Sequence, residues 1–250
     1  MKFSKTFFGS AILLMLFSTQ LAFAQFQGQI SMNIYDVDDG VVEDTNELNL
    51  YTTADRILVK GEDKINVSDG LMEASGILIR GDIQDFVIMT GENEAIRFTK
   101  EELEGFFNMI SMFDNEDELD VETNNEFKYT NEERTIQGLK ATELQVWNDD
   151  GDGYLSIWLT NELDINWSIL TQPWNNLPKG LKKPVDHMTQ EFRSSNFPML
   201  IEAHGKKGDY TIFEVTKVRE SRIAKDMVEV PANVELISLQ TMFMKAMMNK

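Results

Sequence analysis

The chain contains no cysteine, which excludes disulfide bonds, thiol chemistry and attachment of a lipid to an amino-terminal cysteine. A protein without disulfides must hold its fold together through its core. Histidine is nearly as scarce, with only His187 and His204. A zinc site would need further ligands beside either of them. Both residues lie in segments typical of turns or of the surface, so neither is predicted to ligate a metal or act as a base.

Basic residues are also few. The 23 Lys and Arg are outnumbered by 42 Asp and Glu, which gives a formal net charge of −19. Such a charge repels nucleic acid and anionic headgroups, so neither is an expected partner. The simplest interpretation is a solvated acidic surface, which favours solubility and loose binding of cations.

Sequence motifs of common enzymes are missing as well. The chain has no P-loop, no G-x-G-x-x-G and no G-x-S-x-G segment. A carboxylate-based hydrolase stays open as an alternative, but 42 acidic residues guarantee accidental pairs. Their abundance therefore indicates no active site, and we predict no catalytic residue and no cofactor.

Long hydrophobic runs are absent except near the start of the chain. Lys2 and Lys5 precede the apolar run Ala11–Phe17, and Ala22-Phe23-Ala24 has the small-x-small pattern of a signal-peptidase site. The run is short for a bilayer core of about 30 Å, and no stop-transfer flank follows it, which argues against a membrane anchor. Residues Met1–Ala24 are therefore predicted to be a cleaved secretory signal. The mature protein would be periplasmic or secreted, without stable membrane insertion.

The remaining residues, 25–250, alternate between apolar and polar side chains in many short runs. This period of two is typical of strands, and the runs end at clusters of Asp, Gly or Asn that suit turns. We predict one mainly β (α+β) domain with a curved antiparallel sheet, a half-barrel. The predicted strands are Phe26–Ile34, Glu47–Thr52, Arg56–Lys60, Gly76–Arg80, Asp85–Thr90, Ala95–Thr99, Glu126–Thr130, Thr135–Ile136, Ala141–Trp147, Tyr154–Thr160, Pro198–Ala203 and Tyr210–Val218.

Two helices are predicted to cover the concave side of this sheet. Thr99-Lys100-Glu101-Glu102 has the pattern of a capping box, and it opens a helix over Glu101–Phe113 with apolar residues at helical spacing. The second helix is predicted at Glu235–Met248. Both helices are rich in methionine, whose flexible thioether suits an adaptable apolar surface. Packing of the helices against the sheet is the simpler role.

The stretch Trp147–Trp158 partly matches a calcium loop. Asn148, Asp150 and Asp152 fall at the first, third and fifth ligand positions, but Leu159 stands where a bidentate Glu is needed. The flanking residues alternate like strands, which predicts a hairpin loop. No metal site is therefore assigned, although weak calcium binding at these three residues stays open.

Aromatic residues suggest one more kind of site. The four tryptophans could form a platform for a sugar, although packing in the core and at its rim is the simpler role for most of them. They are Trp147, Trp158, Trp167 and Trp174.

The C-terminal half resembles a secreted bacterial family catalogued as domain of unknown function 4412. The resemblance lies in Thr135–Ala141, Ile157–Leu163, Phe197–Leu200 and Met227–Pro231, and it is clearest from about Glu126 to Pro231. It implies a fold similar to the LolA- and LolB-type outer-membrane lipoprotein carriers, in which helices plug a half-barrel that holds acyl chains. It implies no catalytic residues.

These observations favour a non-enzymatic envelope or secreted protein that binds a lipid, a lipoprotein acyl chain or another apolar ligand between sheet and helices. One alternative is a structural or interaction protein with a filled core and no ligand, and a third is the carboxylate-based hydrolase. The residues that bind the ligand and the oligomeric state are left unassigned by the sequence.

Overall fold

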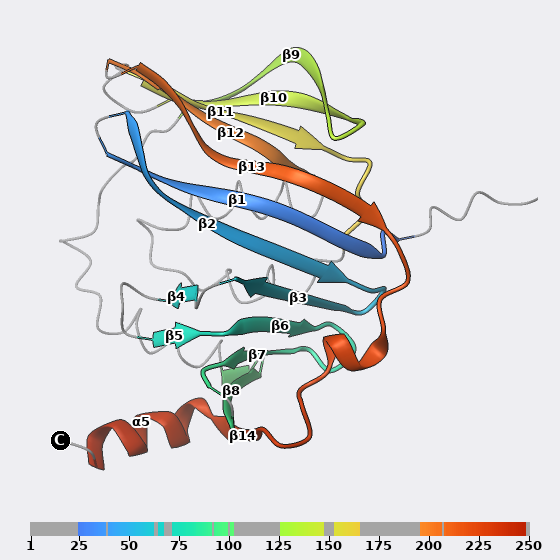
Figure 1. Cartoon of the computed structure of the whole chain (residues 1–250), viewed down its shortest axis with the longest axis vertical. Helices are drawn as coiled ribbons and strands as arrows, with labels where there is room; N and C mark the ends of the chain where they lie inside the picture. Colours follow the sequence, from blue (N-terminus) through green and yellow to red (C-terminus); the bar gives the residue numbers. More distant parts are fainter. Residues whose placement is uncertain are drawn as a thin grey trace, which may run out of the picture.

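Strands dominate the computed structural model, which describes residues 25–38, 40–62, 65–67, 72–91, 93–99, 101–102, 126–147, 153–165, 196–206 and 208–248. Twelve of them form one large curved sheet whose two edge strands do not meet (Figure 1). Their order across the sheet is β14-β8-β7-β6-β3-β2-β1-β13-β12-β11-β10-β9. Neighbours are antiparallel except for β14 and β8. The prediction of a mainly β fold with a curved, unclosed sheet is therefore confirmed.

Both halves of the chain contribute strands to this sheet. The first half supplies β1 (Gly28–Asp38), β2 (Val41–Thr52), β3 (Arg56–Gly61), β6 (Gly76–Arg80), β7 (Asp85–Met89) and β8 (Glu94–Thr99), and β4 (Ile65–Val67) with β5 (Met72–Ala74) forms a separate pair. The second half supplies β9 (Glu126–Ile136), β10 (Leu139–Trp147), β11 (Gly153–Thr160), β12 (Phe197–Gly205), β13 (Gly208–Glu220) and β14 (Glu235–Ser238). The halves meet twice, where β1 pairs with β13 and where β14 pairs with β8.

The alternation in the sequence decides which side chains are buried. Along β1, Ile30 and Met32 are buried on one face, while Gln29 and Ser31 lie on the other and hydrogen-bond to Asn49 of β2 or to each other. The buried residues join a core cluster with side chains from β2, β3, β6, β12, β13 and the segment after β11, among them Leu50, Ile57, Ile79, Met199, Val215, Leu163 and Ile165. This cluster is the main core of the described part of the sheet.

Strands β6 and β7 are apolar on both faces because both faces are covered. On one face Leu58, Leu78 and Val87 are paired in register, and Val228 packs against them. Val228 belongs to residues 221–234, which leave the middle of the sheet at β13 and reach its far edge at β14 (Figure 1). We call residues 221–234 the strap; it contains a short 3-10 helix, η2 (Lys225–Val228).

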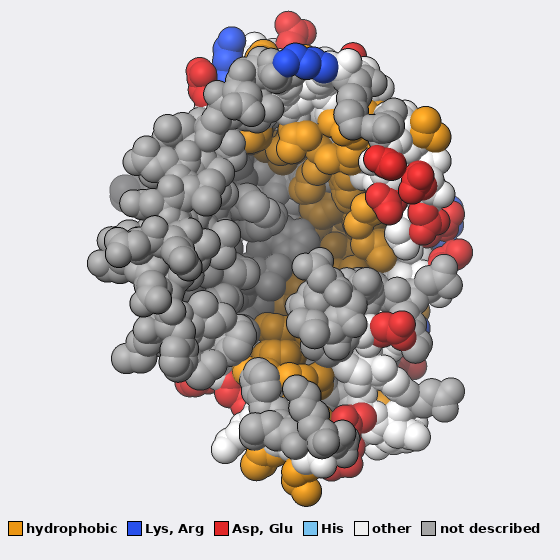
Figure 2. All heavy atoms as spheres, turned by 90° about the vertical axis from the view of Figure 1, so that its left-hand side faces the viewer, with side chains coloured by type: hydrophobic (Ala, Val, Ile, Leu, Met, Phe, Trp, Pro, Cys, Tyr) orange, Lys and Arg blue, Asp and Glu red, His pale blue; other side chains and the backbone are white. Residues whose placement is uncertain are grey.

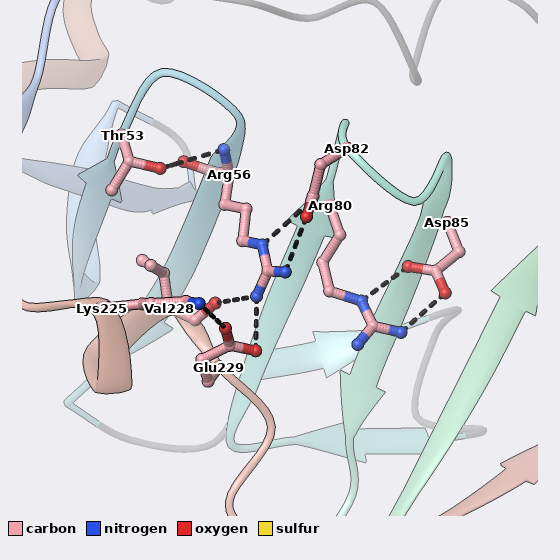
Figure 3. Close-up of polar contacts among 8 residues, drawn as sticks. All are labelled: Thr53, Arg56, Arg80, Asp82, Asp85, Lys225, Val228 and Glu229. Atoms are coloured by element: carbon pink, nitrogen blue, oxygen red, sulfur yellow. Dashed lines mark hydrogen bonds and ion pairs between the residues drawn. The ribbon is translucent and has the colours of Figure 1, made fainter.

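Arg56 ties the strap to the sheet (Figure 3). Its guanidinium donates to Asp82 through Nε (3.0 Å) and Nη2 (2.8 Å), and Nη1 contacts Glu229 (2.5 Å) and the carbonyl of Val228 (3.2 Å). The hydrogen bonds from Arg56 lower the pKa of Asp82. We call this set of contacts the Arg56 clamp.

The prediction of a helix over Glu235–Met248 is wrong in its first turn. Glu235–Ser238 forms β14, which pairs in parallel with β8, and the helix α5 covers Leu239–Met248. The open edge of β8 offers unpaired backbone groups that these four residues satisfy. Ser238 then ends the strand and caps the helix, since its Oγ accepts from the backbone N–H of Thr241 at 3.2 Å.

Helices that cover the concave side are not confirmed. Leu239 and Met242 of α5 pack against the cluster around Ile88 and Ile96, at the β8 edge of the sheet. For the other predicted helix, Glu101–Phe113, the structure confirms the capping box: Thr99 N–H donates to Glu102 (2.9 Å) and Glu102 N–H donates to the Thr99 hydroxyl (3.2 Å). Residues 103–113 lie outside the described part of the chain.

Glu126–Thr130 and Thr135–Ile136 are one strand, β9, rather than two. Asn131 takes a positive φ of 64°, and the register with β10 shifts beside it, so the alternation is interrupted without ending the strand. Gln137 and Gly138, both at positive φ, then form the tight turn to β10.

Candidate functional site

A row of large apolar side chains crosses six neighbouring strands on one face of the sheet. Each member is paired in register with the next, and residues paired in this way lie on the same face. In order from β9 to β1 the row is Tyr129, Leu144, Ile157, Ile201, Phe213 and Ile34. We call these six residues the apolar row.

A second row runs beside the first, nearer to the β10–β11 and β12–β13 turns by two residues on each strand and by three on β13, where a bulge intervenes. It consists of Phe127, Val146, Leu155, Ala203 and Tyr210, again paired in register from β9 to β13. Two adjacent rows make an apolar strip about two side chains wide across this half of the sheet.

Much of this strip is only half-buried. Leu144 is 3% exposed, but Ile34 and Tyr129 at the two ends of the apolar row are 40% and 44% exposed. The members between Leu144 and Ile34, like the whole second row, have intermediate exposure. Figure 2 shows hydrophobic side chains gathered in a hollow on the side of the molecule where the β1–β2 hairpin ends, with Asp and Glu side chains along the rim. A described face that is apolar, hollowed and incompletely buried is the arrangement expected of a binding groove.

Carboxylates follow the apolar row at its β1 end. Asp36 lies two residues beyond Ile34 on the same strand and therefore on the same face. Asp44 of β2 is its direct partner in the register. Across the strands the row continues from Ile34 to the polar Asn46 of β2, and the acidic pair lies two residues further along both strands, toward the hairpin turn.

The opposite face of β9–β12 is polar and its groups satisfy one another. Glu143 is only 8% exposed, and its carboxylate accepts hydrogen bonds from Ser156 (2.5 Å), Thr130 (2.7 Å) and Gln145 (3.2 Å). Burial raises the pKa of Glu143, but the three hydrogen bonds lower it by more than burial raises it. The pKa of Glu143 therefore lies below its ordinary value. A general acid needs the reverse shift. Both oxygens of the Glu143 carboxylate already accept hydrogen bonds from neighbouring side chains, which favours a structural role.

Trp158 and Glu202 are also occupied by their neighbours. The indole Nε1 of Trp158 donates to Glu202 at 3.0 Å, and Arg134 lies 4.3 Å from the centre of the Trp158 ring while it donates to the same carboxylate. Trp158 is 7% exposed, so its ring offers no free face to a sugar. This pattern favours packing over the sugar platform and gives no support to the hydrolase alternative.

Trp147 stacks on Tyr154, with ring centres 4.5 Å apart, and Tyr154 stacks on His204 at 4.6 Å. The three rings are partners across β10, β11 and β12, and such cross-strand pairs stabilise a sheet. His204 also contacts Asp209 at 3.1 Å. Because the ring faces are turned toward one another, this ladder favours a structural role for Trp147 and for His204.

Other predicted sites fall outside the described residues. These are the calcium-loop residues Asn148, Asp150 and Asp152, together with His187, Trp167 and Trp174. Among the residues that the structure does describe, no group of three or more His, Asp or Glu side chains is placed to hold a metal ion. Within the same ranges, no helix has both the length and the apolar character needed to cross a bilayer.

Comparison with known proteins gives no family for the chain. No family model matches it, so the resemblance to domain of unknown function 4412 stays a prediction. No curated protein matches either. Among solved structures, a chain of PNGF-II is similar with 15% identity and a TM-score of 0.42, over 89% of this chain and 33% of that one. The protein therefore spans about a third of the PNGF-II chain.

A LolA superfamily protein from Nitrosomonas europaea is similar with 10% identity and a TM-score of 0.30, over 82% of this chain and 91% of that one. At these TM-scores neither likeness establishes a shared fold or a function.

Sequence reasoning predicted an apolar concavity but not the residues that line it. The alternation placed Leu155 and Ile157 on one face of a strand, as the structure does. Which residue of a neighbouring strand lies beside them depends on register, and β-bulges in β12 and β13 shift that register. No local signal in the sequence reports those shifts.

Proposed function

We propose that the protein is a non-enzymatic envelope or secreted protein that binds one acyl chain, or a similar elongated apolar ligand, along the apolar row. The observation that carries the proposal is the unbroken lateral pairing from Tyr129 to Ile34 across six strands, half-buried over most of its length. A filled core would bury these side chains evenly, as it buries Ile30 and Met199.

The dimensions of the row suit this ligand. Neighbouring strands are about 4.8 Å apart, so the five spacings between six strands span about 24 Å. One acyl chain fills half of a bilayer core of about 30 Å, which is roughly 15 Å. The row is therefore long enough for an extended chain that lies across the strands.

The energy available is also adequate. Burial of a methylene contributes about 0.8 kcal/mol, so eight buried methylenes give roughly 6 kcal/mol before the cost of association. An apolar ligand obtains this binding free energy only where apolar protein surface is still exposed to water and can be covered. Ile34 and Tyr129, the exposed ends of the apolar row, are such surface.

Two expectations from the sequence agree with this function. The secretory signal predicted at Met1–Ala24 would place the protein outside the cytoplasm. The resemblance to domain of unknown function 4412 implies a carrier-like half-barrel. A structural or interaction protein without a ligand is the other candidate, and the experiment below separates the two.

The substitution Ala203→Trp tests the groove. Ala203 lies in the second row, between Leu155 and Tyr210, and an indole there would fill the strip without removing any core side chain. Binding of the neutral fluorescent probe N-phenyl-naphthylamine should fall at least about tenfold in the variant, because the lost apolar contact area is that of several methylenes. Titration of probe fluorescence measures this.

Ala232→Trp is the matched control, since Ala232 is exposed in the strap. It should bind the probe like the wild-type protein. The proposal fails if the wild-type protein binds no apolar probe and yields no acyl species on native mass spectrometry, or if both tryptophan variants bind equally.

A further inference from the structure

We infer that the apolar groove selects an amphiphile whose head carries a positive charge, such as a primary or quaternary ammonium, over one with a carboxylate or phosphate head. This inference rests on the proposed function and adds the class of ligand. It is argued from the charges that meet the ligand where the apolar row ends on β1.

The first observation is a pair of like charges. Asp36 and Asp44 face each other across β1 and β2 on the groove face, two residues nearer to the hairpin turn than the pair Ile34 and Asn46. Like charges in this position destabilise a strand pair. Within the described part of the chain, Asp36 has no ion-pair partner, and Asp44 accepts one hydrogen bond, from the backbone N–H of Thr45 at 2.8 Å.

The second observation is the charge of the whole hairpin. Residues 25–55 contain no Lys or Arg at all, while Asp36, Asp38 and Asp44 lie on the groove face of β1 and β2. Glu47, whose partner is Asn33, lies on the opposite face. Figure 2 shows acidic side chains along the rim of the hollow on this side. The hairpin therefore presents only negative charge to the end of the groove.

The neighbouring turn does not reverse this charge. The turn between β12 and β13 opens on the same side of the sheet as the β1–β2 hairpin (Figure 1). Its sequence carries Lys206 and Lys207, and Asp209 offsets one of them. The remaining charge of +1 is smaller than the charge of −3 that Asp36, Asp38 and Asp44 carry on the groove face. A ligand whose chain lies on the apolar row thus has its head against a net negative potential, which attracts a cation and repels an anion.

The apolar row and the acidic pair together define an amphiphile. The row alone would accept any chain, and the carboxylates alone would bind any cation loosely. Their direct succession on one face favours a molecule that carries both parts, with the ammonium group next to Asp36 and Asp44.

The test compares three ligands with one chain length: dodecylamine, dodecanoate and the monoacylglycerol of dodecanoic acid. Each is used at submicellar concentration to displace N-phenyl-naphthylamine from the full protein at low salt and neutral pH. We expect dodecylamine to displace the probe at roughly fivefold lower concentration than the neutral ligand, and dodecanoate at a higher one, as for a single charge contact in water. The difference should shrink in 0.5 M salt, because the Debye length falls to roughly 4 Å.

The double variant Asp36→Asn/Asp44→Asn locates the effect. Both side chains are exposed, so the variant should fold. Its preference for dodecylamine should be lost. Asp55→Asn/Asp226→Asn removes the same charge at two exposed positions away from the groove and should keep the preference.

The possible outcomes separate the two proposals. If no ligand displaces the probe, the groove itself is wrong. If all three displace it equally, or if the preference survives in Asp36→Asn/Asp44→Asn, the groove stands and the selection by charge is wrong.

Discussion

Two arginines face each other across β3 and β6, and each is held by an aspartate (Figure 3). Arg80 donates to Asp85 at 2.7 and 2.6 Å with side-chain exposures of 9% and 2%, whereas Asp82, the partner of Arg56, is 38% exposed. Removal of one partner from a buried ion pair costs about 3 to 5 kcal/mol, because the other charge stays buried without a partner. Asp85→Asn should therefore lower the free energy of unfolding by about 3 kcal/mol in urea titration.

Asp82→Asn is the natural control for this pair. It breaks the same kind of contact at an exposed position, where an ion pair contributes only about 1 kcal/mol or less. Equal losses in Asp85→Asn and Asp82→Asn would contradict the argument that burial decides the cost.

Glu143 makes stability depend on pH. Its pKa in the folded protein lies below the ordinary value of 4.5, although burial alone would raise it, because Ser156, Thr130 and Gln145 donate to the carboxylate. A lowered folded pKa gives stability that is present above the unfolded pKa and lost as the pH falls through the folded one. Glu143→Gln lacks this contribution.

The difference in unfolding free energy between wild-type protein and Glu143→Gln should therefore shrink from pH 6 to pH 3. Urea titration at the two pH values measures it. Glu132→Gln, at an exposed position of β9, should leave the difference small at both. If the difference in unfolding free energy between wild-type protein and Glu143→Gln grew at low pH, the hydrogen bonds to Glu143 would not favour its ionised form.

At the scale of the element, the strap carries the chain from β13 to the edge strand β14, and the Arg56 clamp fixes it. Its carboxylates Asp82 and Glu229 are 38% and 35% exposed, so each contact contributes about 1 kcal/mol or less. Together the contacts reach the roughly 1.4 kcal/mol that corresponds to a tenfold change. Arg56→Met keeps the apolar stem but loses the contacts with Asp82, Glu229 and the Val228 carbonyl. Backbone amides of β14 and the strap should exchange hydrogen at least about tenfold faster in Arg56→Met.

Arg219→Met, at an exposed position of β13, is the control and should leave exchange in β14 unchanged. Uniformly faster exchange over the whole sheet in Arg56→Met would instead mean that the clamp supports global stability rather than this one element.

The sequence predicts some elements better than others for physical reasons. Gly76–Arg80 coincides with β6, because a short apolar run bounded by turn residues has one interpretation. Glu235–Ser238 was predicted as the start of a helix but forms the strand β14. The apolar residues Leu236, Ile237 and Leu239 fit the stripe of a helix as well as a strand. Only the free edge of β8 decides between them. Val41–Asn46, the exposed start of β2, shows no alternation and was missed because pairing with β1 alone holds it in the sheet.

At the scale of the whole molecule, the curved unclosed sheet follows from alternation, whereas the apolar row follows from strand order. Ile34 and Phe213 are far apart in the sequence and become neighbours only because β1 pairs with β13. No period within a segment carries that information. The candidate groove is therefore a product of non-local pairing, and only its apolar composition could be foreseen.

The pairing of β1 with β13 also has a kinetic consequence. An early strand sits at the centre of the sheet, yet one of its sides stays vacant until residues near 213 have been synthesised. The vacant backbone of β1 is meanwhile a template for wrong partners, and closure of so long a loop is slow. The sheet should therefore fold after translation and not during it. A chaperone that binds the nascent chain should help most during the period in which β1 is paired with β2 but not yet with β13.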